Sequence, residues 1–527
     1  MKPQTVGEAL VAGLKARDVT CVFGIPGVHT VELYRGLANS GIRHITPRHE
    51  QGAGFMADGY ARACGKPGVA FVITGPGLTN TLTPMAQARA DSVPMLVVSG
   101  VNAGPSLGKG HGHLHELPDQ HALAASVALT SQHVATPADL SPALERAFAP
   151  FATGRPGPTH IQIPLDVAGA EAQDLPSQTA YRPPPLDPDV IAKAAARLCE
   201  ARQIVILAGG GAKQAGPQLR ALAERLDAPV VQTANARGLM HGHALTVPAS
   251  PSLRAVRDLI EAADCVLALG TELGPTDYDM YDSGSIASMA GLIRIDICPR
   301  QLARRDADLS IAGSADQAAS ALLSALPPHP KQAQGASRAE TTRAAAFAEI
   351  GPAYRSQVDI LNAIRDAVPQ ALVVGDSTQP IYAGNLYFDH DRPGGWFNAA
   401  TGYGALGYGI PAAIGAAVAA PDSPVICIAG DGGAQFSLPE IMAAVDENLP
   451  VTFVLWNNRG YGEIASSMEA VDVPVVGCDP SPPDFAATAQ SFGIPYHPVT
   501  SEPQAIAAAV GQASRSGRAS IVEIDVT

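Results

Sequence analysis

Two polar segments follow apolar runs in the last part of the chain. The run "VICIAGDGG" places Asp431 among glycines, and the run "PVTFVLWNN" ends at Asn458, two residues before Gly460. The stretch between the runs is long enough for one helix and one strand, so both segments would end neighbouring parallel strands. Ligands of open α/β sheets bind beyond the carboxyl ends of the strands. We therefore expect Asp431 and Asn458 to lie side by side at a ligand site.

The oxygen atoms of these residues suit a hard cation. The Asp431 carboxylate, the Asn458 side-chain carbonyl and the Gly460 backbone carbonyl form half of the octahedral shell of Mg²⁺, which phosphate oxygens and water would complete. Three glycines beside Asp431 let a diphosphate approach the backbone, namely Gly430, Gly432 and Gly433. The alternative is an ordinary turn capped by Asp and Asn, since both are common in turns. The pairing of the two segments favours the ligand site.

Short apolar runs alternate with helix-period segments along the whole chain. Strands are expected at 19–27, 42–50, 68–77, 93–100 and 158–166, then at 203–211, 228–233, 265–270 and 291–297, and finally at 371–376, 423–431, 450–458 and 520–526. Helices are expected at 30–41 and 51–65. Buried parallel strands have this near-continuous apolar character. The pattern predicts the α/β class, with three doubly wound parallel-sheet domains.

Two polar, Pro-containing stretches interrupt the alternation. They lie at 169–187 and 327–344 and are expected to be linkers. A chain of 527 residues is too long for one hydrophobic core. We therefore predict domains at 1–168, 188–326 and 345–527.

Composition excludes several classes of partner. The formal net charge is −14, which argues against nucleic acid, because phosphate binding needs a basic face. The seven cysteines are scattered without a CxxC pair, which favours free thiols over disulfides or a zinc site. No apolar run is long enough for a membrane span, and the N-terminal segment lacks the core of a signal peptide. We expect a cytoplasmic protein without a membrane partner.

The Asp431 and Asn458 segments together resemble the GDG…NN pattern of thiamine-diphosphate-dependent enzymes. Along nearly its whole length the chain is similar to the superfamily of acetolactate synthase, pyruvate decarboxylase and benzoylformate decarboxylase. The resemblance implies a pyrimidine-binding first domain, a central domain, and a third domain that binds the diphosphate and Mg²⁺, with the first and third of similar fold. It also implies that the cofactor lies between two subunits. A homodimer is the minimum assembly, and we expect a homotetramer.

The resemblance assigns Glu50, in "RHEQGAGF", to the aminopyrimidine ring of the cofactor. A carboxylate bonded to N1′ favours the imino tautomer, whose nitrogen can take the thiazolium C2 proton. Taken alone, a glutamate at a helix start is commonly a surface residue stabilised by the helix dipole. The resemblance implies further cofactor contacts in the first and third domains, at Gly75, Asn80, Ser377, Thr378, Gly404, Leu406 and Tyr461.

The central domain contains "AGGGAKQAG" after an expected strand. Its glycines indicate a nucleotide-binding turn, but the GxGxxG pattern is absent. Acetolactate synthases hold FAD in this domain, and their flavin-contacting segment matches the stretch 235–252 poorly. We therefore do not expect FAD.

Acidic residues distinguish this chain from the decarboxylases and synthases that it resembles. Glu463 replaces a small or aliphatic residue of the substrate pocket, and Glu272 replaces a synthase arginine. Further acids follow or lie near the expected pocket, namely Glu116, Asp119, Asp277, Asp279 and Asp282. An acidic pocket predicts a 2-oxo acid with a cationic tail, as in the 5-guanidino-2-oxopentanoate decarboxylases. The alternative is that these acids are solvated loop residues.

Histidines add candidate proton donors. His111, His113 and His115 alternate, and three such residues on one strand face could bind zinc. Alternatively, His113 or His115 protonates the decarboxylated intermediate, as the paired histidines of pyruvate decarboxylases do. His29 lies in a loop that lines the pocket of relatives. Glu463 is a second candidate donor, because its neighbour Ile464 occupies the position of a catalytic glutamate in pyruvate decarboxylases.

These patterns predict a thiamine-diphosphate- and Mg²⁺-dependent enzyme that decarboxylates a small-molecule 2-oxo acid without oxidation. An acetolactate-synthase-like carboligase, which joins the decarboxylated fragment to a second carbonyl substrate, is the main alternative. A catalytically silent member that binds the cofactor as a scaffold is the other.

Overall fold

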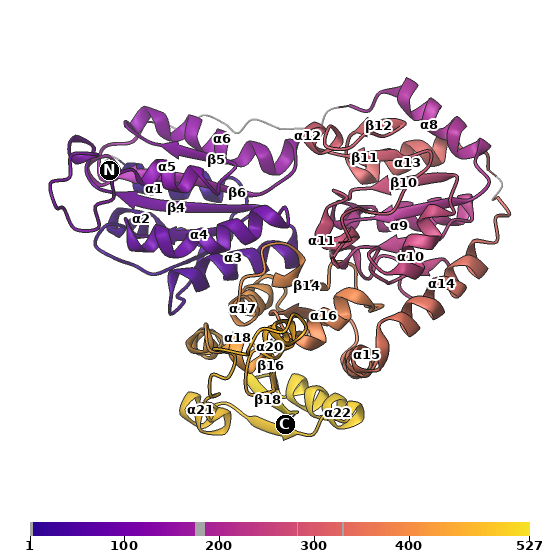
Figure 1. The fold of residues 1–527 in the computed structure, drawn as a ribbon. Coiled ribbons are helices and arrows are strands. Elements are labelled where there is room, and N and C mark those ends of the chain that lie inside the picture. Colours follow the sequence, from indigo (N-terminus) through magenta and orange to yellow (C-terminus); the bar gives the residue numbers. More distant parts are fainter. Residues whose placement is uncertain (1–3, 174–184, 282, 329–330, 527) are drawn as a thin grey trace.

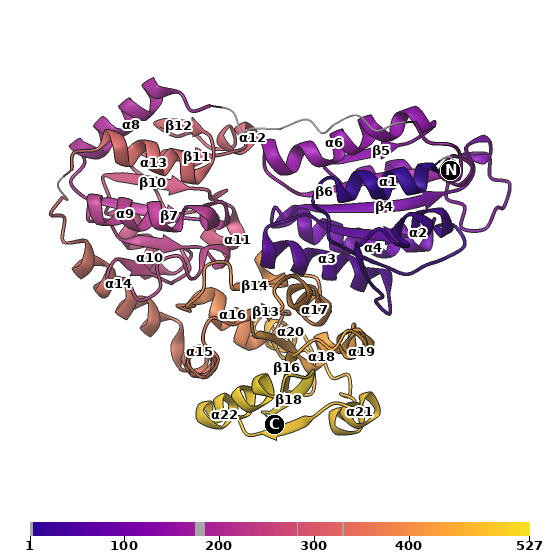
Figure 2. The same ribbon diagram turned by 180° about the vertical axis from the view of Figure 1, so that it is seen from behind.

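The computed structural model describes residues 4–173, 185–281, 283–328 and 331–526. Within them lie three six-stranded sheets, and every strand pair in the sheets is parallel. Figures 1 and 2 show the first and central domains side by side, with the third domain against both. The prediction of three α/β parallel-sheet domains is confirmed. No helix in the described ranges is long and apolar enough to cross a bilayer.

The first sheet has the order β2-β1-β3-β4-β6-β5. Its strands are β1 (Cys21–Gly24), β2 (Arg43–Ile45), β3 (Gly68–Val72), β4 (Met95–Val101), β5 (Thr130–His133) and β6 (Pro158–Pro164). The helices of this domain are α1 (Val6–Lys15), α2 (Val31–Leu37), α3 (Glu50–Cys64), α4 (Pro76–Ala90), η1 (Gly104–Ser106), α5 (Gln120–Ala125), η2 (Pro137–Asp139), α6 (Leu140–Thr153) and α7 (Leu165–Ala168). Helices α1, α2 and α6 bury one face of the sheet, and α3 and α4 bury the other.

The third sheet has the order β14-β13-β15-β16-β18-β17, which repeats the topology of the first. Its strands are β13 (Leu372–Gly375), β14 (Trp396–Asn398), β15 (Val425–Gly430), β16 (Val451–Asn457), β17 (Tyr496–Val499) and β18 (Ser520–Asp525). The helices are α15 (Gly351–Ala367), α16 (Gln379–Leu386), η5 (Ala399–Thr401), α17 (Gly409–Ala419), α18 (Asp431–Ala434), η6 (Leu438–Glu440), α19 (Ile441–Asp446), α20 (Gly462–Glu469), α21 (Phe485–Phe492) and α22 (Pro503–Arg515). The predicted similarity of the first and third domains is confirmed at the level of strand order.

The central sheet has the order β12-β11-β10-β7-β8-β9, the arrangement of dinucleotide-binding folds. Its strands are β7 (Ile204–Ala208), β8 (Val230–Gln232), β9 (Thr246–Val247), β10 (Cys265–Leu269), β11 (Ile293–Asp296) and β12 (Leu309–Ala312). The helices are α8 (Pro188–Glu200), η3 (Gly210–Ala215), α9 (Gly216–Leu226), η4 (Ala234–Ala236), α10 (Arg254–Glu261), α11 (Pro275–Tyr278), α12 (Pro299–Leu302), α13 (Ala315–Ala325) and α14 (Gly335–Glu349).

One expected linker is partly helical. The stretch 327–344 contains the first two thirds of α14, which packs on α10 through Ala339 and Ala346. Its alanine-rich sequence forms a helix with only a narrow buried stripe, so the apolar periodicity is weak. The other expected linker, 169–187, lies largely outside the described residues.

Helices α3 and α17 join the first and third domains (Figures 1 and 2). They approach so closely that a methyl group at Gly59 would collide with the Ala412 carbonyl, and one at Gly415 would collide with the Met56 carbonyl. Side chains of both domains form one continuous hydrophobic cluster around this contact. The contact fixes the helix that begins at Glu50 relative to the third domain.

Candidate cofactor site

The carboxyl ends of three neighbouring strands, β13, β15 and β16, meet at one edge of the third sheet. Strands β15 and β16 run in register, with Gly430 opposite Trp456. Asp431 follows β15 directly, and Asn458 follows β16 directly. The backbone N–H of Asn458 donates to Asp431 Oδ1 across 3.3 Å. The structure therefore places these two predicted metal ligands side by side.

Three polar groups converge at this point. One terminal amide atom of Asn458 lies 2.9 Å from Asp431 Oδ1 and 2.8 Å from the Gly460 carbonyl oxygen. With nitrogen at this position the amide donates to both oxygens, and with oxygen there the three oxygens face one another. Adjacent ligands of an octahedral Mg²⁺ lie about 3 Å apart, because each metal–oxygen bond is about 2.1 Å. The set therefore fits a small, hard cation.

Asp431 itself supports this fit. The residue is fully buried, and its Oδ2 has no hydrogen-bond partner among the residues that the structure describes. Burial raises the pKa of this carboxyl, although the backbone N–H of Asn458 opposes the shift. A buried carboxylate without a full set of partners is costly. A bound cation would satisfy the unpartnered oxygen.

A cavity of about 370 Å³ opens beside this site. Its lining includes eleven predicted residues, namely Ser377, Thr378, Gly404, Leu406, Gly430, Gly432, Gly433, Asn458, Gly460, Tyr461 and Glu463. It also includes Gln379, Tyr382, Ala400, Gly462 and Ile464, of which only Ile464 was considered from the sequence. Tyr382 lies on α16, one helical turn beyond the N-cap residue Thr378. From this spacing, the sequence could have indicated that Tyr382 faces the same cavity. The structure thus gathers the predicted third-domain residues in one place.

At two glycines of the cavity lining, no side chain covers the backbone. A Cβ at Gly432 would lie 2.5 Å from Tyr461 Cε1, and a Cβ at Gly430 would lie 3.0 Å from Thr378 Oγ1. Any side chain there would displace these neighbours. The backbone of this turn is therefore accessible to a ligand, as a diphosphate requires.

Asp376 holds the segment that carries Gly404 and Leu406 through hydrogen bonds. It is almost fully buried, and its carboxylate accepts the backbone N–H groups of Gly407 at 3.3 Å and Gly409 at 2.8 Å. Burial raises the pKa of Asp376 to about 6, and the N–H donors oppose that shift. This residue follows β13, so it ties the glycine-rich segment to the sheet. This structural role was not predicted from the sequence.

The predicted first-domain residues gather at a different place. Glu50 begins α3 and is half-buried, and its Oε2 accepts the Asn80 side-chain amide at 3.0 Å. Gly75 precedes α4 with φ +67, and a Cβ there would lie 2.6 Å from the His115 carbonyl oxygen. No residue of this group lines the third-domain cavity. One chain therefore carries two separate half-sites.

His115 packs against His29 in the first half-site. Their ring centroids lie 5.1 Å apart in an edge-to-face arrangement. Burial lowers the pKa of His29, and the neighbouring His115 lowers it further. The backbone of His115 is left-handed, with φ +63. The pair lies beside the Gly75 turn, where a proton donor for a bound substrate is expected.

The three alternating histidines do not form a zinc site. His111 and His113 are exposed in a loop with ring centroids 5.9 Å apart, whereas His115 lies with His29. The Glu116 carboxylate accepts the backbone N–H groups of His111, Gly112 and His113, which bends the loop. Among the described residues, no group of three or more His, Cys, Asp or Glu is placed to hold a metal. The zinc alternative is therefore wrong, and the expected strand is a loop.

Most of the predicted acids have partners away from the third-domain cavity. Glu272 pairs with Arg155 at 2.7 Å, and Asp279 accepts the N–H groups of Ser283 and Gly284. Asp119 caps α5, Asp277 does not line the cavity, and Asp282 lies outside the described residues. The predicted acids that the structure describes do not share one cavity, because Glu272 pairs with an arginine of the first domain, and Asp119 and Asp279 accept backbone N–H groups. Of these acids, only Glu463 lines the third-domain cavity.

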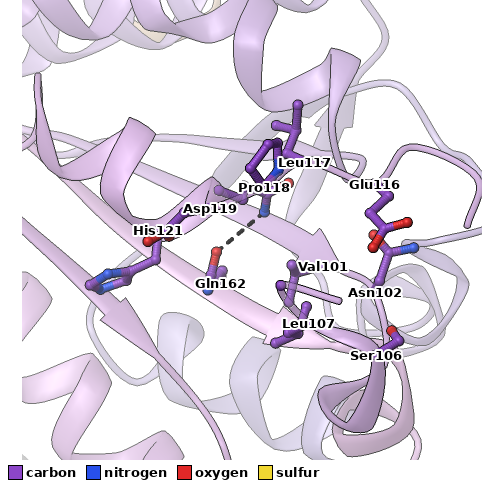
Figure 3. Close-up of a pocket in the computed structure, with 12 residues that line it drawn as sticks. Val101, Asn102, Ser106, Leu107, Glu116, Leu117, Pro118, Asp119, His121 and Gln162 are labelled. Atoms are coloured by element: carbon purple, nitrogen blue, oxygen red, sulfur yellow. Dashed lines mark hydrogen bonds between the residues drawn. The ribbon is translucent and has the colours of Figure 1, made fainter. Parts of the chain in front are cut away.

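A second cavity, of about 270 Å³, lies in the first domain (Figure 3). Asn102, Glu116, Asp119 and His121 line it, together with Gln120 and Gln162. Gln120 Nε2 donates to Gly100 O at 2.9 Å and to Gln162 Oε1 at 3.3 Å, and Gln120 Oε1 accepts the Gly75 N–H at 2.9 Å. This hydrogen-bonded wall supports the Gly75 turn from behind, and the sequence did not reveal it.

Comparison with known proteins agrees with the two half-sites. Residues 4–123 match the thiamine pyrophosphate enzyme N-terminal TPP-binding domain, residues 191–322 match the central domain, and residues 376–524 match the C-terminal TPP-binding domain. The chain is 45% identical over 504 residues to a probable 2-ketoarginine decarboxylase, AruI, of Pseudomonas aeruginosa, which covers 94% of this chain and 89% of the relative.

Acetolactate synthases are more distant relatives. The large subunit from Parasynechococcus marenigrum is 32% identical over 520 residues, covering 93% of this chain and 83% of the relative. Isozyme 3 of Escherichia coli is 31% identical over 512 residues, covering 92% and 88%. The chain therefore belongs to the thiamine pyrophosphate enzyme family, and its first and third domains are the cofactor-binding domains of that family.

Proposed function

We propose that the protein uses thiamine diphosphate and Mg²⁺ to decarboxylate 5-guanidino-2-oxopentanoate, or a close 2-oxo acid with a cationic tail. One observation carries the choice of substrate. Glu463 is half-buried on the cofactor cavity, and its carboxylate has no cationic partner among the described residues. The name of the relative at 45% identity supports the choice, since 2-ketoarginine is the same compound as 5-guanidino-2-oxopentanoate.

A guanidinium would meet complementary groups here. A carboxylate binds it through charge-assisted, often bidentate hydrogen bonds. Tyr382 lines the same cavity, and an aromatic ring can bind a cation. Burial raises the pKa of Tyr382, and the charge of Glu463 raises it further, which supports their proximity. Glu463 thus acts as a specificity residue, and a comparison of two substrates in one variant distinguishes this role from proton donation.

The third-domain residues would hold the diphosphate and the metal. Asp431, Asn458 and the Gly460 carbonyl would bind Mg²⁺. Residues around the glycine-rich turn would contact the diphosphate, namely Ser377, Thr378, Gly430, Gly432 and Gly433. The Gly404 carbonyl would accept from the aminopyrimidine, Leu406 would pack between the two rings, and Tyr461 would line the site. We do not expect FAD, because the flavin-contacting segment of acetolactate synthases is poorly matched at 235–252.

The first-domain residues would carry out the proton chemistry. Bound thiamine diphosphate would supply the nucleophilic carbon for the 2-oxo group and, in its thiazolium ring, the electron sink for loss of CO₂. Glu50, held by Asn80, would hydrogen-bond the aminopyrimidine, and Gly75 would line it. His115 is better placed than His113 to deliver the final proton, because it is half-buried beside Gly75 whereas His113 is exposed.

Both half-sites are bordered by exposed apolar side chains. Tyr403, Phe436 and Ile464 border the third-domain cavity at 56%, 58% and 53% exposure. Val28 and Leu114 lie beside the first half-site at 71% and 62% exposure. Apolar surface of this kind marks protein interfaces. We therefore propose a homodimer at least, and a homotetramer as the full assembly, in which Glu50 of one subunit faces the partner's Asp431.

A substrate panel tests the proposed function. The holoenzyme would be assayed with 5-guanidino-2-oxopentanoate, pyruvate and benzoylformate, and CO₂, aldehyde and acetolactate would be measured. The proposal expects the guanidino acid to have the highest kcat/KM, with an aldehyde as product. Preference for pyruvate with acetolactate as product would instead establish the carboligase alternative, for which the synthase relatives provide the precedent.

A further inference from the structure

Glu440 is a buried carboxylate that the proposed chemistry does not use. It ends η6 in the third domain, and only 2% of the residue is exposed. Its Oε2 accepts the backbone N–H of Arg48 and its Oε1 accepts that of His49, both at 2.9 Å. These two residues directly precede Glu50. A third-domain side chain therefore holds the backbone from which the Glu50 carboxylate projects.

Packing around this contact leaves little freedom. A Cβ at Gly52 would collide with the Glu440 carboxylate, so the first turn of α3 lies directly against it. Two exposed ion pairs also lie nearby, Arg48 with Asp446 at 2.5 Å and Arg43 with Glu447 at 2.7 Å. Exposed pairs contribute little, typically less than about 1 kcal/mol. The two hydrogen bonds of Glu440 are thus the contacts that fix this backbone segment, and the exposed ion pairs add little to them.

The charge of Glu440 needs an explanation. Burial raises the pKa of Glu440 to about 7, and the two backbone N–H groups and Arg48 oppose the shift. Burying a carboxylate is costly, and an apolar residue could fill this space without that cost. A carboxylate, however, offers two acceptor oxygens at fixed separation, which match two consecutive N–H groups. Its geometry suits the task of orienting a backbone segment.

We propose that Glu440 is a positioning residue for Glu50, which it orients toward the aminopyrimidine by fixing the backbone of Arg48 and His49. The inference rests on the proposed function, because it takes Glu50 as the group that contacts the cofactor. A displacement of about 1 Å at such a group typically costs on the order of 100-fold in turnover. Glu440 reaches the chemistry only through the backbone, so it is not itself a catalytic residue.

Three variants separate positioning from packing. Glu440→Gln keeps the shape but turns one acceptor into a donor that faces an N–H. Glu440→Ala with Gly52→Ala refills much of the space with a methyl group but supplies no acceptor. Asp446→Asn is the matched control, because it breaks the exposed pair with Arg48 and leaves both backbone hydrogen bonds intact.

Two readouts are needed for these variants. We expect Glu440→Gln and the double variant to lower kcat by about 10- to 100-fold with KM within about threefold of wild type. Hydrogen exchange of the apo protein should be faster at the amides of Arg48 and His49 in both, while Asp446→Asn matches wild type in both measurements. Wild-type kcat or wild-type exchange in Glu440→Gln would overturn the inference. Wild-type kcat in the double variant, which has no acceptor, would overturn it as well.

Glu50→Gln separates this failure from that of the proposed function. If Glu50→Gln keeps wild-type turnover, the proposed function itself fails, whatever Glu440 does. If Glu50→Gln is inactive while Glu440→Gln is fully active, only the positioning role fails. The exchange measurement needs neither cofactor nor substrate, so it reports the Glu440 contact in either case.

Discussion

The side-chain amide of Asn80 donates to the Glu50 carboxylate across 3.0 Å, joining α4 to the first residue of α3. This bond engages one Glu50 oxygen and leaves the other available. Asn80→Asp should therefore place two like-charged carboxylates in contact, and their repulsion should displace the Glu50 side chain. We expect kcat at neutral pH to fall further than the loss of the hydrogen bond alone would cause.

The kcat of the variants at neutral pH checks this prediction. Asn80→Ala serves as the control, because it removes the donor without adding charge and should cost only about 5- to 10-fold, as expected for loss of one hydrogen bond. An Asn80→Asp kcat equal to that of Asn80→Ala would contradict the predicted repulsion between the two carboxylates.

Asp431 should control the response to divalent cations. Chelation of Mg²⁺ should inactivate the wild-type enzyme, and added Mg²⁺ should restore it. Asp431→Asn should lose at least about 100-fold in activity, since a neutral amide is a poor replacement for a carboxylate ligand. The measurement is the Mg²⁺ dependence of activity together with the metal content of the purified protein.

Two results would contradict the proposed role of Asp431. Wild-type activity that survives exhaustive chelation would show that the converging oxygens near Asn458 do not hold a required metal. An Asp431→Asn enzyme with unchanged Mg²⁺ dependence would place the metal elsewhere.

Glu463 should set substrate preference. Glu463→Gln replaces a charge-assisted bond to the guanidinium with a neutral one, a loss of about 1.4–3 kcal/mol, or roughly 10- to 150-fold in kcat/KM. Decarboxylation of pyruvate should not fall, because pyruvate has no cationic tail. Glu469→Gln, on the exposed side of the same helix, is the control.

Equal losses for both substrates would point instead to proton donation by Glu463. In that case the acidic or basic limb of the kcat profile should also shift in Glu463→Gln. Specificity and proton transfer are thus distinguished by comparing two substrates in one variant.

His160 should make stability depend on pH. It is fully buried between Ser99 and Ser131, and burial lowers its pKa to about 3, with a smaller contribution from His121. In the unfolded chain this pKa is about 6.5. Between these values the unfolded state binds the extra proton, so stability is lost as pH falls from about 6.5 toward 3, by up to about 1.4 kcal/mol per pH unit.

The melting temperatures of wild type and His160→Asn at several pH values test this assignment. The advantage of wild type over the variant should shrink as the pH is lowered from about 6.5 to 4.5, because the variant lacks the titrating group. A difference that stays constant over this range would show that His160 does not titrate in the unfolding equilibrium.

The strands that the sequence predicted correctly are mainly the central ones. The apolar runs of β3, β4, β15 and β16 are buried on both faces, so their pattern is strong. The five unpredicted strands, β5, β9, β12, β14 and β17, all lie at sheet edges. These five strands have only two to four residues, so short segments such as "TSQH" in β5 carry little periodic apolar signal.

The candidate site likewise contains residues whose positions the sequence predicts and contacts that it does not predict. Asp431, Asn458 and the glycines beside them are close in sequence to the strands that position them, so local spacing predicts where they lie. The partner of Glu272 is Arg155 in another domain, and the backbone groups held by Glu440 are in another domain as well. Contacts between distant segments leave no local pattern. Neither the partner of Glu272 nor the positioning contact could therefore be predicted from the sequence.

The central claim is that one active site is built from Glu50 of one subunit and the partner's Asp431. Mixing Glu50→Gln and Asp431→Asn subunits, each inactive alone, under conditions that exchange subunits tests it directly. Random pairing makes half of the dimers mixed, each with one intact site of two, so about a quarter of wild-type activity should return. Failure of mixed dimers to regain activity, with subunit exchange demonstrated, would contradict the shared site.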